Sequence, residues 1–343
     1  MMRKLIVMLL VLLVAVVPAC GSPYVMKLGY QDPPDLFLAN EHPASFVFKS
    51  IVEAKTDGGI TVELYPSGIL GKEVEQLENC QLGIIQSTIV CSGPMATFVP
   101  EYNLTALPFL FPNNIVAWKV LDGWFGKELA DTILKKTGLR VLGIMEDGGF
   151  TAVTNSVREI RTPQDMRGLK MRTEEHPAHI EFTKAVGAGA VPIAWAEVYT
   201  SLQTGVADGQ YNALPIIVLG KLYEVQKYVT RLEHIYNTDV WVINNEWFTS
   251  LPKDYQRIII EAAEVANAVG RGVTSIANAT GADLLISEGI RVYTPSPEER
   301  DAFRDIAQPK VIEWLQKLIG PEWVDKALRA VEEASAELEA IAE

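Results

Sequence analysis

Hydrophobic and polar positions in the first hundred residues follow two alternating periods. Residues 60–64 alternate apolar and polar side chains, which is typical of a half-buried strand. Residues 47–54 place apolar side chains at the spacing of one helix face, and a second helix is predicted over 72–83. Two more strands are predicted over 25–30 and 84–92. The order strand, helix, strand, helix, strand favours a largely parallel sheet with helices on both faces.

The same alternation returns in the middle of the chain. Its predicted strands cover 139–145, 168–171 and 206–210, and its predicted helices cover 178–186 and 196–204. Two α/β groups of this size predict two lobes.

One helical pattern is much longer than the others. It opens after Pro252 and continues from residue 253 to about residue 288, beyond the usual length of a helix in a globular protein. A strand predicted at 240–246 precedes it, and amphipathic helices fill the C-terminal segment. A helix of this length suits a strut that spans both lobes, so we expect an α/β protein with this architecture.

The N-terminal segment 1–20 is predicted to be a secretory signal peptide. Arg3 and Lys4 form its positive region, and an apolar run from Leu5 to Val17 follows, too short to span a bilayer comfortably. Its end, VPAC, resembles a bacterial lipobox, in which a lipid is attached to the cysteine, here Cys20. Ordinary cleavage nearby is the alternative. We therefore expect a periplasmic protein, anchored in the membrane only where Cys20 is lipidated.

The acidic balance of the chain limits its partners. The formal net charge is −13 at pH 7 over 343 residues. This charge argues against nucleic acid and anionic lipid as partners, because both are negatively charged themselves. A site for an anionic ligand must therefore be locally positive.

The sequence lacks the common motifs of catalysis and cofactor binding. It has no Walker loop, no G-x-S-x-G, no H-E-x-x-H and no C-x-x-C, and GAGA at 187–190 lacks the context of a dinucleotide site. We therefore expect no cofactor and no enzyme activity. Cys80 lies on the apolar face of a predicted helix and Cys91 ends a predicted strand, which favours two free, mostly buried thiols over a disulfide.

Two histidines, His176 and His179, stand beside two acids, Glu174 and Glu175. A three-residue spacing on a helix could place both imidazoles in one metal site. Pro177 places His176 before the helix, however, and no metal is predicted. We expect solvated residues at a helix start, with a ligand contact from Glu175 or His176 as the alternative.

Arg172 and Trp195 are the strongest candidates for binding residues. Arg172 follows the strand predicted at 168–171, and ligands of α/β proteins usually bind where strands end. Its guanidinium has a planar fork of donors that matches the two oxygens of a carboxylate. Trp195 stands in a predicted loop before a helix, where an indole can wall a pocket. A surface charge and a core side chain are the respective alternatives.

Five segments of the chain resemble one family, in order and at the expected spacing. They are LGKEVEQLENCQLG, ALPFLF, TPQDMRGLKMR, AWAEVYTSLQTGVADGQYN and KLYEVQKYV. Over nearly its whole mature length the chain resembles the substrate-binding proteins of tripartite ATP-independent periplasmic (TRAP) transporters, the dicarboxylate and sialic acid receptors. The resemblance implies a two-lobed periplasmic binding protein fold in which a long helix spans both lobes. It places lobe I at 24–148 and 238–277, and lobe II at 149–237 and 278–343.

The resemblance also implies a ligand site. In it, Arg172 pairs with the carboxylate of the ligand, Trp195 stacks on the ligand and Asn212 donates hydrogen bonds. Glu73 and Cys91 fall at positions that line the pocket in the sialic acid receptors. No residue has a catalytic role.

Three departures from the family pattern indicate a less polar site. Many relatives carry a second arginine some way before the first, where this chain has GGFTAVTN with Phe150. Tyr211 stands in place of the usual glutamate, and Cys91 takes the position of a pocket acid. One arginine suits one carboxylate, so we expect a monocarboxylate with an apolar or aromatic body, such as a 2-oxo or aryl acid. Phe150 and Tyr211 join Glu175 among the candidate ligand contacts.

The expected function is that of a receptor that binds a small organic acid and delivers it to the membrane subunits of a TRAP permease. A receptor of the same fold that presents a carboxylate to a signalling partner is the alternative. An exported enzyme that anchors its substrate at Arg172 is disfavoured, because no nucleophile–base pairing is legible in the sequence.

Overall fold

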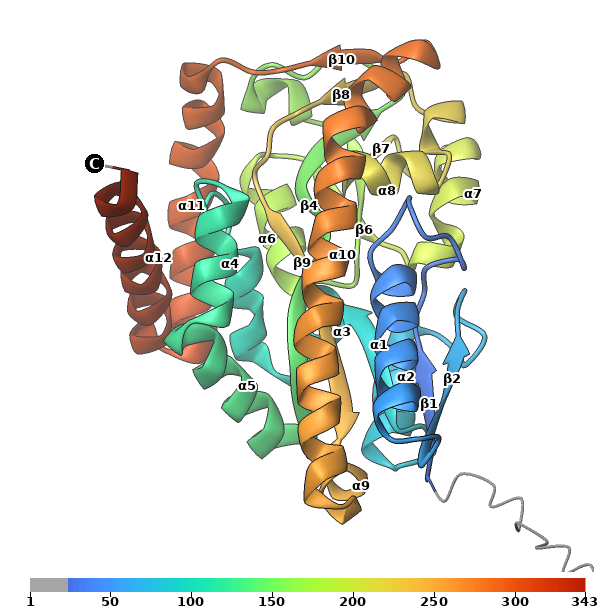
Figure 1. The fold of residues 1–343 in the computed structure, drawn as a ribbon. Coiled ribbons are helices and arrows are strands. Elements are labelled where there is room, and N and C mark those ends of the chain that lie inside the picture. The colour runs from blue at the N-terminus through green and yellow to red at the C-terminus, as the bar shows by residue number, and fades with distance from the viewer. Residues whose placement is uncertain (1–23, 343) are drawn as a thin grey trace, which may run out of the picture.

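A single mixed sheet runs through the molecule (Figure 1). The computed structural model describes residues 24–342, so the predicted signal peptide and Cys20 lie outside the described residues. The strands are β1 (Tyr24–Gly29), β2 (Ile60–Tyr65), β3 (Ser87–Cys91), β4 (Leu139–Asn155), β5 (Lys170–Thr173), β6 (Gly189–Pro192), β7 (Gly209–Ala213), β8 (Tyr228–Thr230), β9 (Tyr236–Asn244) and β10 (Arg291–Tyr293). Their order is β2-β1-β3-β9-β4-β7-β5-β6, and β8 pairs with both β4 and β10.

Helices cover both faces of this sheet (Figure 1). The α-helices are α1 (Glu41–Lys55), α2 (Glu73–Gln81), α3 (Ser92–Phe98), α4 (Asn114–Asp122), α5 (Trp124–Thr137), α6 (Pro177–Ala185), α7 (Val198–Gln203), α8 (Leu214–Leu219), α9 (Asn245–Ser250), α10 (Lys253–Ser287), α11 (Pro297–Ile319) and α12 (Pro321–Ala342). The 3₁₀ turns are η1 (Pro100–Ala106), η2 (Pro163–Met166), η3 (Trp195–Glu197) and η4 (Leu222–Glu224). Between residues 24 and 342, no helix combines the length and the apolar character that a membrane crossing needs.

Strands β4 and β9 join two halves of the sheet. Residues 139–150 of β4 pair antiparallel with β9, whereas residues 151–155 pair with β7 and β8. The register of β4 against β9 breaks between Glu146 and Gly149. Gly148 and Gly149 have φ values of +64° and +85°, a left-handed backbone that side chains beyond glycine rarely adopt. This break coincides with the lobe boundary predicted between residues 148 and 149; the boundaries themselves stay a prediction.

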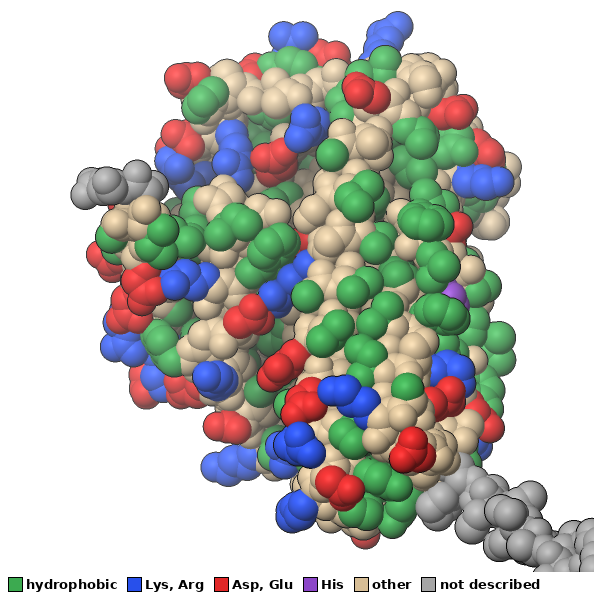
Figure 2. Space-filling model, in the orientation of Figure 1, with side chains coloured by type: hydrophobic (Ala, Val, Ile, Leu, Met, Phe, Trp, Pro, Cys, Tyr) green, Lys and Arg blue, Asp and Glu red, His purple; other side chains and the backbone are tan. Residues whose placement is uncertain are grey.

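Helix α10 spans both halves, which confirms the predicted strut. It is 35 residues long and packs against α1, β4 and α8. Its buried face carries small side chains, among them Ala262, Ala263 and Ala266, which let the helix approach the sheet closely. In Figure 2 charged side chains gather near the lower end of α10, where Arg257 pairs with Glu261 at 3.2 Å.

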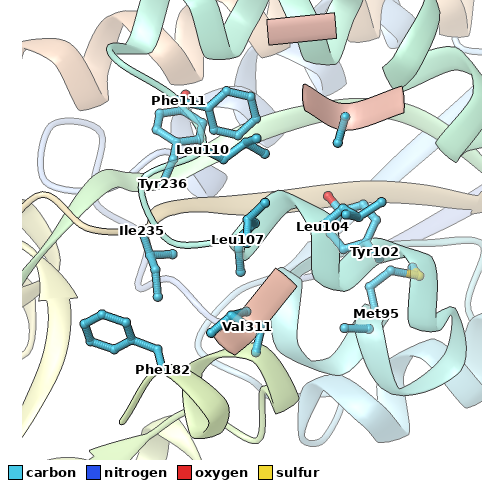
Figure 3. Packing of buried hydrophobic residues seen from close by; sticks show 14 of the residues in the cluster. Met95, Tyr102, Leu104, Leu107, Leu110, Phe111, Phe182, Ile235, Tyr236 and Val311 are labelled. Atoms are coloured by element: carbon cyan, nitrogen blue, oxygen red, sulfur yellow. The ribbon is translucent and has the colours of Figure 1, made fainter. Parts of the chain in front are cut away.

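Hydrophobic side chains fill the space on both faces of the sheet. On one face, α1 and α10 cover the sheet, and the fully buried rings of Phe48 and Trp241 lie 4.8 Å apart. Truncation of a buried aromatic of this kind to alanine costs roughly 3–5 kcal/mol. On the other face, Figure 3 shows Val311 of α11 near Leu107 and Phe182. Helix α11 therefore packs against α6 and against the segment after η1, which come from the two halves.

The bounds of four predicted strands need correction. The strand predicted at 139–145 continues to Asn155, because its second part finds new partners in β7 and β8. The strand predicted at 206–210 starts at Gly209 instead. The strands of the first hundred residues are parallel as predicted, since β1 pairs in parallel with β2 and β3. The sheet as a whole is mixed, because β9 is antiparallel to β3 and β4.

Strand β9 ends earlier than predicted. The strand predicted to reach residue 246 stops at Asn244. The side chain of Asn244 accepts a hydrogen bond from the Trp247 backbone N–H at 2.8 Å and so begins helix α9.

Arg172 lies within strand β5 and not after it. Its backbone pairs with Val191 of β6 and Gln210 of β7, so the strand end predicted at 171 is two residues early. Strand partners on both sides hold the Arg172 backbone, and its side chain therefore starts from a fixed position.

Candidate functional site

A cavity of about 360 Å³ lies between the two halves of the sheet. Side chains from the start of α1, from α2, β3, β4 and β9 line it on one side, and side chains from β5, η3, β7 and α8 line it on the other. The acidic wall is defined by Asp32, Glu41, Glu73, Asp147 and Asp239. The arginine wall is defined by Arg172, Trp195, Asn212, Ile216 and Leu219.

Arg172 is buried but largely unpaired. Its side chain lines the cavity and the residue is 2% exposed. Its Nε donates a hydrogen bond to the Ile193 carbonyl at 2.9 Å, which fixes the plane of the guanidinium. Among the described residues, no hydrogen bond or ion pair is made by its Nη1 or Nη2. Burial lowers the pKa of Arg172, yet a guanidinium stays protonated in proteins, so two charged donor groups await an acceptor.

Apolar side chains surround the rest of the arginine wall. Trp195 is half-buried and packs against Gly220, where an added methyl group would lie 2.7 Å from Trp195 Cη2. Ile216 and Leu219 of α8 extend this surface, and Pro94 faces it from the other half. Asn212 lies among them, and its Nδ2 already donates to Gln210 at 2.7 Å.

The acidic wall is held by hydrogen bonds between the loop after β1 and the start of α1. The Asp32 backbone N–H donates to Glu41 Oε2 at 2.6 Å, and the Glu41 backbone N–H donates to Asp32 Oδ2 at 3.1 Å. Asn40 Nδ2 donates to Asp239 at 2.6 Å, and Asn237 Nδ2 donates to Asp147 at 2.7 Å. None of these four acids is among the site residues predicted from the sequence, and the expected loss of polarity is absent from this wall.

Burial shifts the acid–base behaviour of this wall. It raises the pKa of Asp32 to about 7, and the charge of Asp147 adds to the effect. Burial likewise raises the pKa of Glu41, Asp147 and Asp239, and the charge of a neighbouring acid raises each of these pKa values further. The wall therefore holds bound protons near neutral pH when no cation is close to it.

Cys91 lies between Glu73 of the acidic wall and Glu174, which follows strand β5. The Cys91 backbone N–H donates to Glu73 Oε1 at 2.6 Å, and Cys91 Sγ lies 3.5 Å from Glu73 and 3.4 Å from Glu174. Burial raises the pKa of Glu73 to about 7 and that of the Cys91 thiol well above its ordinary value. Cys91 is thus a neutral thiol, and both Cys80 and Cys91 are free, as predicted.

The structure brings six of the eight predicted contact residues to this cavity. They are Arg172, Trp195, Asn212, Glu73, Cys91 and Glu175. Phe150 instead lines a second cavity of about 290 Å³, next to Tyr236. Tyr211 is buried away from both cavities, where its ring contacts Phe182 and its hydroxyl accepts a hydrogen bond from Thr183 at 3.2 Å.

Comparison with known proteins assigns the chain to a family. The sequence profile described as bacterial extracellular solute-binding protein, family 7, matches residues 39–317. The chain belongs to the family 7 extracellular solute-binding proteins. Its membership agrees with the TRAP resemblance read from the five sequence segments, which is thereby confirmed.

Family 7 relatives match most of this chain. It is 38% identical to a solute-binding protein of Verminephrobacter eiseniae (strain EF01-2), over 71% of this chain and 72% of that protein. It is 32% identical to the 2,3-diketo-L-gulonate-binding periplasmic protein YiaO of Escherichia coli (strain K12), over 86% and 88% respectively. The structure of the sugar acid binding protein DctPAm from Advenella mimigardefordensis strain DPN7T in complex with galactonate superposes with a TM-score of 0.86 at 34% identity, covering 91% of this chain and 99% of that chain.

These relatives settle the general class of the protein. It is a periplasmic solute receptor of the TRAP type with the predicted two-lobed α/β fold, and it is a binding protein, not an enzyme. The relatives lend no support to the alternative of a sensory receptor.

The prediction that His176 and His179 are solvated is wrong for this family 7 receptor. His176 and His179 are 0% and 1% exposed, and their rings stack 4.4 Å apart. His176 does precede the helix, since its Nδ1 accepts a hydrogen bond from the Ala178 backbone N–H at 3.2 Å. Burial lowers the pKa of both rings, so they are neutral near pH 7. The expectation fails because η1 and α3 cover the helix start: the Ala178 backbone N–H also donates to Asn103 Oδ1 of η1 at 3.2 Å, and Gly93 of α3 lies beside His176.

Two of the missed acids have a recognisable sequence context. Asp239 directly precedes the apolar run VWVI of a buried strand, and Asp147 directly precedes two glycines. A carboxylate inside a buried strand rarely serves packing, because its burial costs free energy. Asp32 and Glu41 have no such context, since each stands in a polar loop or at a helix start.

Proposed function

We propose that this family 7 receptor binds a small monocarboxylate with a partly apolar or aromatic body and delivers it to the membrane subunits of a TRAP permease. The unpaired guanidinium of Arg172, 2% exposed at the cavity, carries the proposal. A buried cation with two free donor groups matches one carboxylate through two parallel hydrogen bonds. Removal of both charges from water then requires this pairing, because a lone buried charge is strongly unfavourable.

The rest of the cavity argues against a second carboxylate. Beyond Arg172 the only other basic residue in the lining is Lys72, whose Nζ lies 3.3 Å from Glu197 and whose side chain is 62% exposed. A dicarboxylate would direct its second charge toward the acidic wall, where it meets no cation among the lining residues and raises the pKa of the acids further. Trp195, Ile216 and Leu219 offer apolar contact to the body of the ligand instead.

The named ligands of two relatives support one carboxylate. The Escherichia coli relative is named for 2,3-diketo-L-gulonate, and the Advenella structure contains galactonate. Each of these molecules has a single carboxylate. The apolar or aromatic body is supported by the side chains of this chain alone.

A thermal-shift screen of the purified protein tests the proposal. The panel contains monocarboxylates, dicarboxylates, sugar acids, aryl acids and 2-oxo acids, each with wild type, Arg172→Ala and the surface control Arg257→Ala. A ligand at 100 times its Kd adds about 2.7 kcal/mol to the free energy of unfolding, which raises Tm by several degrees. We expect the largest shift from a monocarboxylate, lost in Arg172→Ala and kept in Arg257→Ala.

Two results would contradict this proposal. Succinate or sialate giving a larger shift than every aryl, apolar or 2-oxo monocarboxylate would exclude the proposed ligand class. A shift that survives Arg172→Ala unchanged would show that another group binds the carboxylate.

A further inference from the structure

The acidic wall offers more hydrogen-bond acceptors than the protein uses. Asp32, Asp147 and Asp239 each have one carboxyl oxygen bonded to a protein N–H. The bonds are Glu41 N to Asp32 Oδ2 at 3.1 Å, Asn237 Nδ2 to Asp147 Oδ2 at 2.7 Å, and Asn40 Nδ2 to Asp239 Oδ2 at 2.6 Å. The second oxygen of each has no hydrogen bond with a described residue and is not sealed from solvent. Three free acceptors therefore border the cavity.

Within residues 24–342, no Lys, Arg or His forms an ion pair with these three acids. The Nζ of Lys72 lies against Glu197 at the rim, and no described carboxylate lies within ion-pairing distance of Arg172. Burial raises the pKa of Asp147, and the charge of Asp239 is the next largest cause. The empty wall must therefore either hold protons or accept repulsion between carboxylates, and a cation of the ligand would remove both costs.

Arg172 gives an independent indication of how a ligand is oriented. Its free Nη groups lie on the opposite wall, so the carboxylate of a ligand and its other polar group meet opposite charges. On the basis of the proposed function, we infer that the ligand is a zwitterion whose carboxylate binds Arg172 and whose protonated amino group binds Asp32, Asp147 and Asp239. The ligand class is then an amino acid with an apolar or aromatic body.

An ammonium group fits this wall better than a hydroxyl group does. It has three N–H donors for oxygens that the wall leaves free, and it carries the positive charge that the neighbouring carboxylates lack. A hydroxyl group gives one donor and no charge, so it would leave the carboxylates to repel one another. A sugar acid would therefore pair with Arg172 but bring no positive charge to the acidic wall, whose acids would keep their bound protons.

Matched ligand pairs test the inference. The pairs are phenylalanine and 3-phenyllactate, leucine and 2-hydroxy-4-methylpentanoate, and 4-aminobutyrate and 4-hydroxybutyrate, titrated calorimetrically at pH 7.5 into the purified protein. Within the pair that binds most tightly, we expect the amino member to bind at least about 10-fold more tightly, because its hydrogen bonds are charge-assisted. The preference should fall to within about threefold in Asp239→Asn and Asp32→Asn and persist in Asp283→Asn, an exposed acid on α10.

A second measurement uses only the wild-type protein, in case the asparagine variants fail to fold. Titration of the same amino member in two buffers of different ionisation enthalpy at pH 7 should show net release of protons relative to the hydroxy member. Protons leave because a bound ammonium lowers the raised pKa of the acids around it.

The outcomes separate the two proposals. A hydroxy member that binds as tightly as its amino partner, an amino member that releases no additional protons, or a panel in which no amino member binds overturns the zwitterion. The proposed function survives these results as long as a monocarboxylate binds and Arg172→Ala abolishes its binding. If no carboxylate binds, or if binding is unchanged in Arg172→Ala, both the proposed function and the zwitterionic ligand are contradicted.

Discussion

The two walls of the cavity differ in how firmly their charge is fixed. Arg172 keeps its positive charge because a guanidinium does not lose its proton in a protein. The acids opposite it change charge with their surroundings, since burial brings the pKa of Asp32 and of Glu73 to about 7. One wall therefore presents the same charge to every ligand, while the other adjusts its protons to the ligand that arrives.

This difference separates selection for charge from selection for the rest of the molecule. The arginine wall recognises a carboxylate by charge and by the planar geometry of its donors. The acidic wall discriminates by whether a ligand supplies donors and charge to oxygens that the protein leaves unpaired. The four predictions that follow test this contrast.

The largest effect is expected for Arg172→Lys. Lysine keeps the positive charge but cannot make two parallel hydrogen bonds to one carboxylate, so the tightest monocarboxylate should bind roughly 100-fold more weakly, about 2.7 kcal/mol. Calorimetric titration measures the change, and the surface variant Arg257→Lys is the control. A loss of affinity below threefold would show that Arg172 contributes only its positive charge and that two parallel hydrogen bonds are not needed.

Trp195→Ala should weaken binding by about 10-fold, because the ligand body loses a large apolar contact. Gly220→Ala tests the same contact without removing it. An added methyl group at Gly220 would lie 2.7 Å from Trp195, so the indole must shift, and we expect a smaller loss of affinity. Equal affinity in wild type and both variants, measured by titration with one monocarboxylate, would exclude Trp195 from the contact surface.

The ligand-free protein should lose stability as the pH rises from about 6.5 to about 8. Asp32 and Glu73 have raised pKa values near 7 in the folded state, so in this window the folded state binds more protons than the unfolded state. The free energy of unfolding then falls with rising pH, by about 1 kcal/mol for each such group. The buried histidines have lowered pKa values and oppose this trend only below about pH 6.5.

Urea unfolding at several pH values measures this slope. Asp32→Asn should flatten it, because the amide does not titrate, and Asp283→Asn should leave it unchanged. A wild-type protein whose stability rises across the same window would mean that the acidic wall is ionised and compensated without a ligand.

The smallest effect is expected for Glu175→Gln. Glu175 lines the cavity but is exposed to solvent, and screened surface charges contribute little free energy. We expect less than a twofold change in ligand affinity at physiological salt. A tenfold change would place Glu175 in direct contact with the ligand and extend the site beyond the two walls.

The sequence predicts best what local pattern determines. The length of α10 follows from its own periodicity, and Arg172 and Trp195 stand out by residue type and position. The acidic wall depends on long-range pairing instead. Asp239 comes beside Cys91 only because β9 pairs with β3 across more than a hundred residues, and it comes beside Met145 only because β9 also pairs with β4.

The histidines fail prediction for a related reason. Local sequence places His176 correctly before its helix, yet the burial of His176 and His179 depends on packing with η1 and α3, which come from a distant, earlier part of the chain. Periodicity predicts which face of a helix or strand is apolar. It does not predict which distant segment covers the polar N-terminus of a helix.

The position of β9 constrains the order in which the protein can assemble. This strand lies between β3 and β4, although it is formed only by Tyr236–Asn244. A chain that crosses a membrane with its N-terminus first therefore presents β3 with an unpaired edge until residue 244 of 343 has emerged. Such an edge is a template for mispairing with other chains. Since Asp239 belongs to the same strand, the ligand cavity is completed late in translocation, and a truncated chain that ends before β9 should neither bind nor remain soluble.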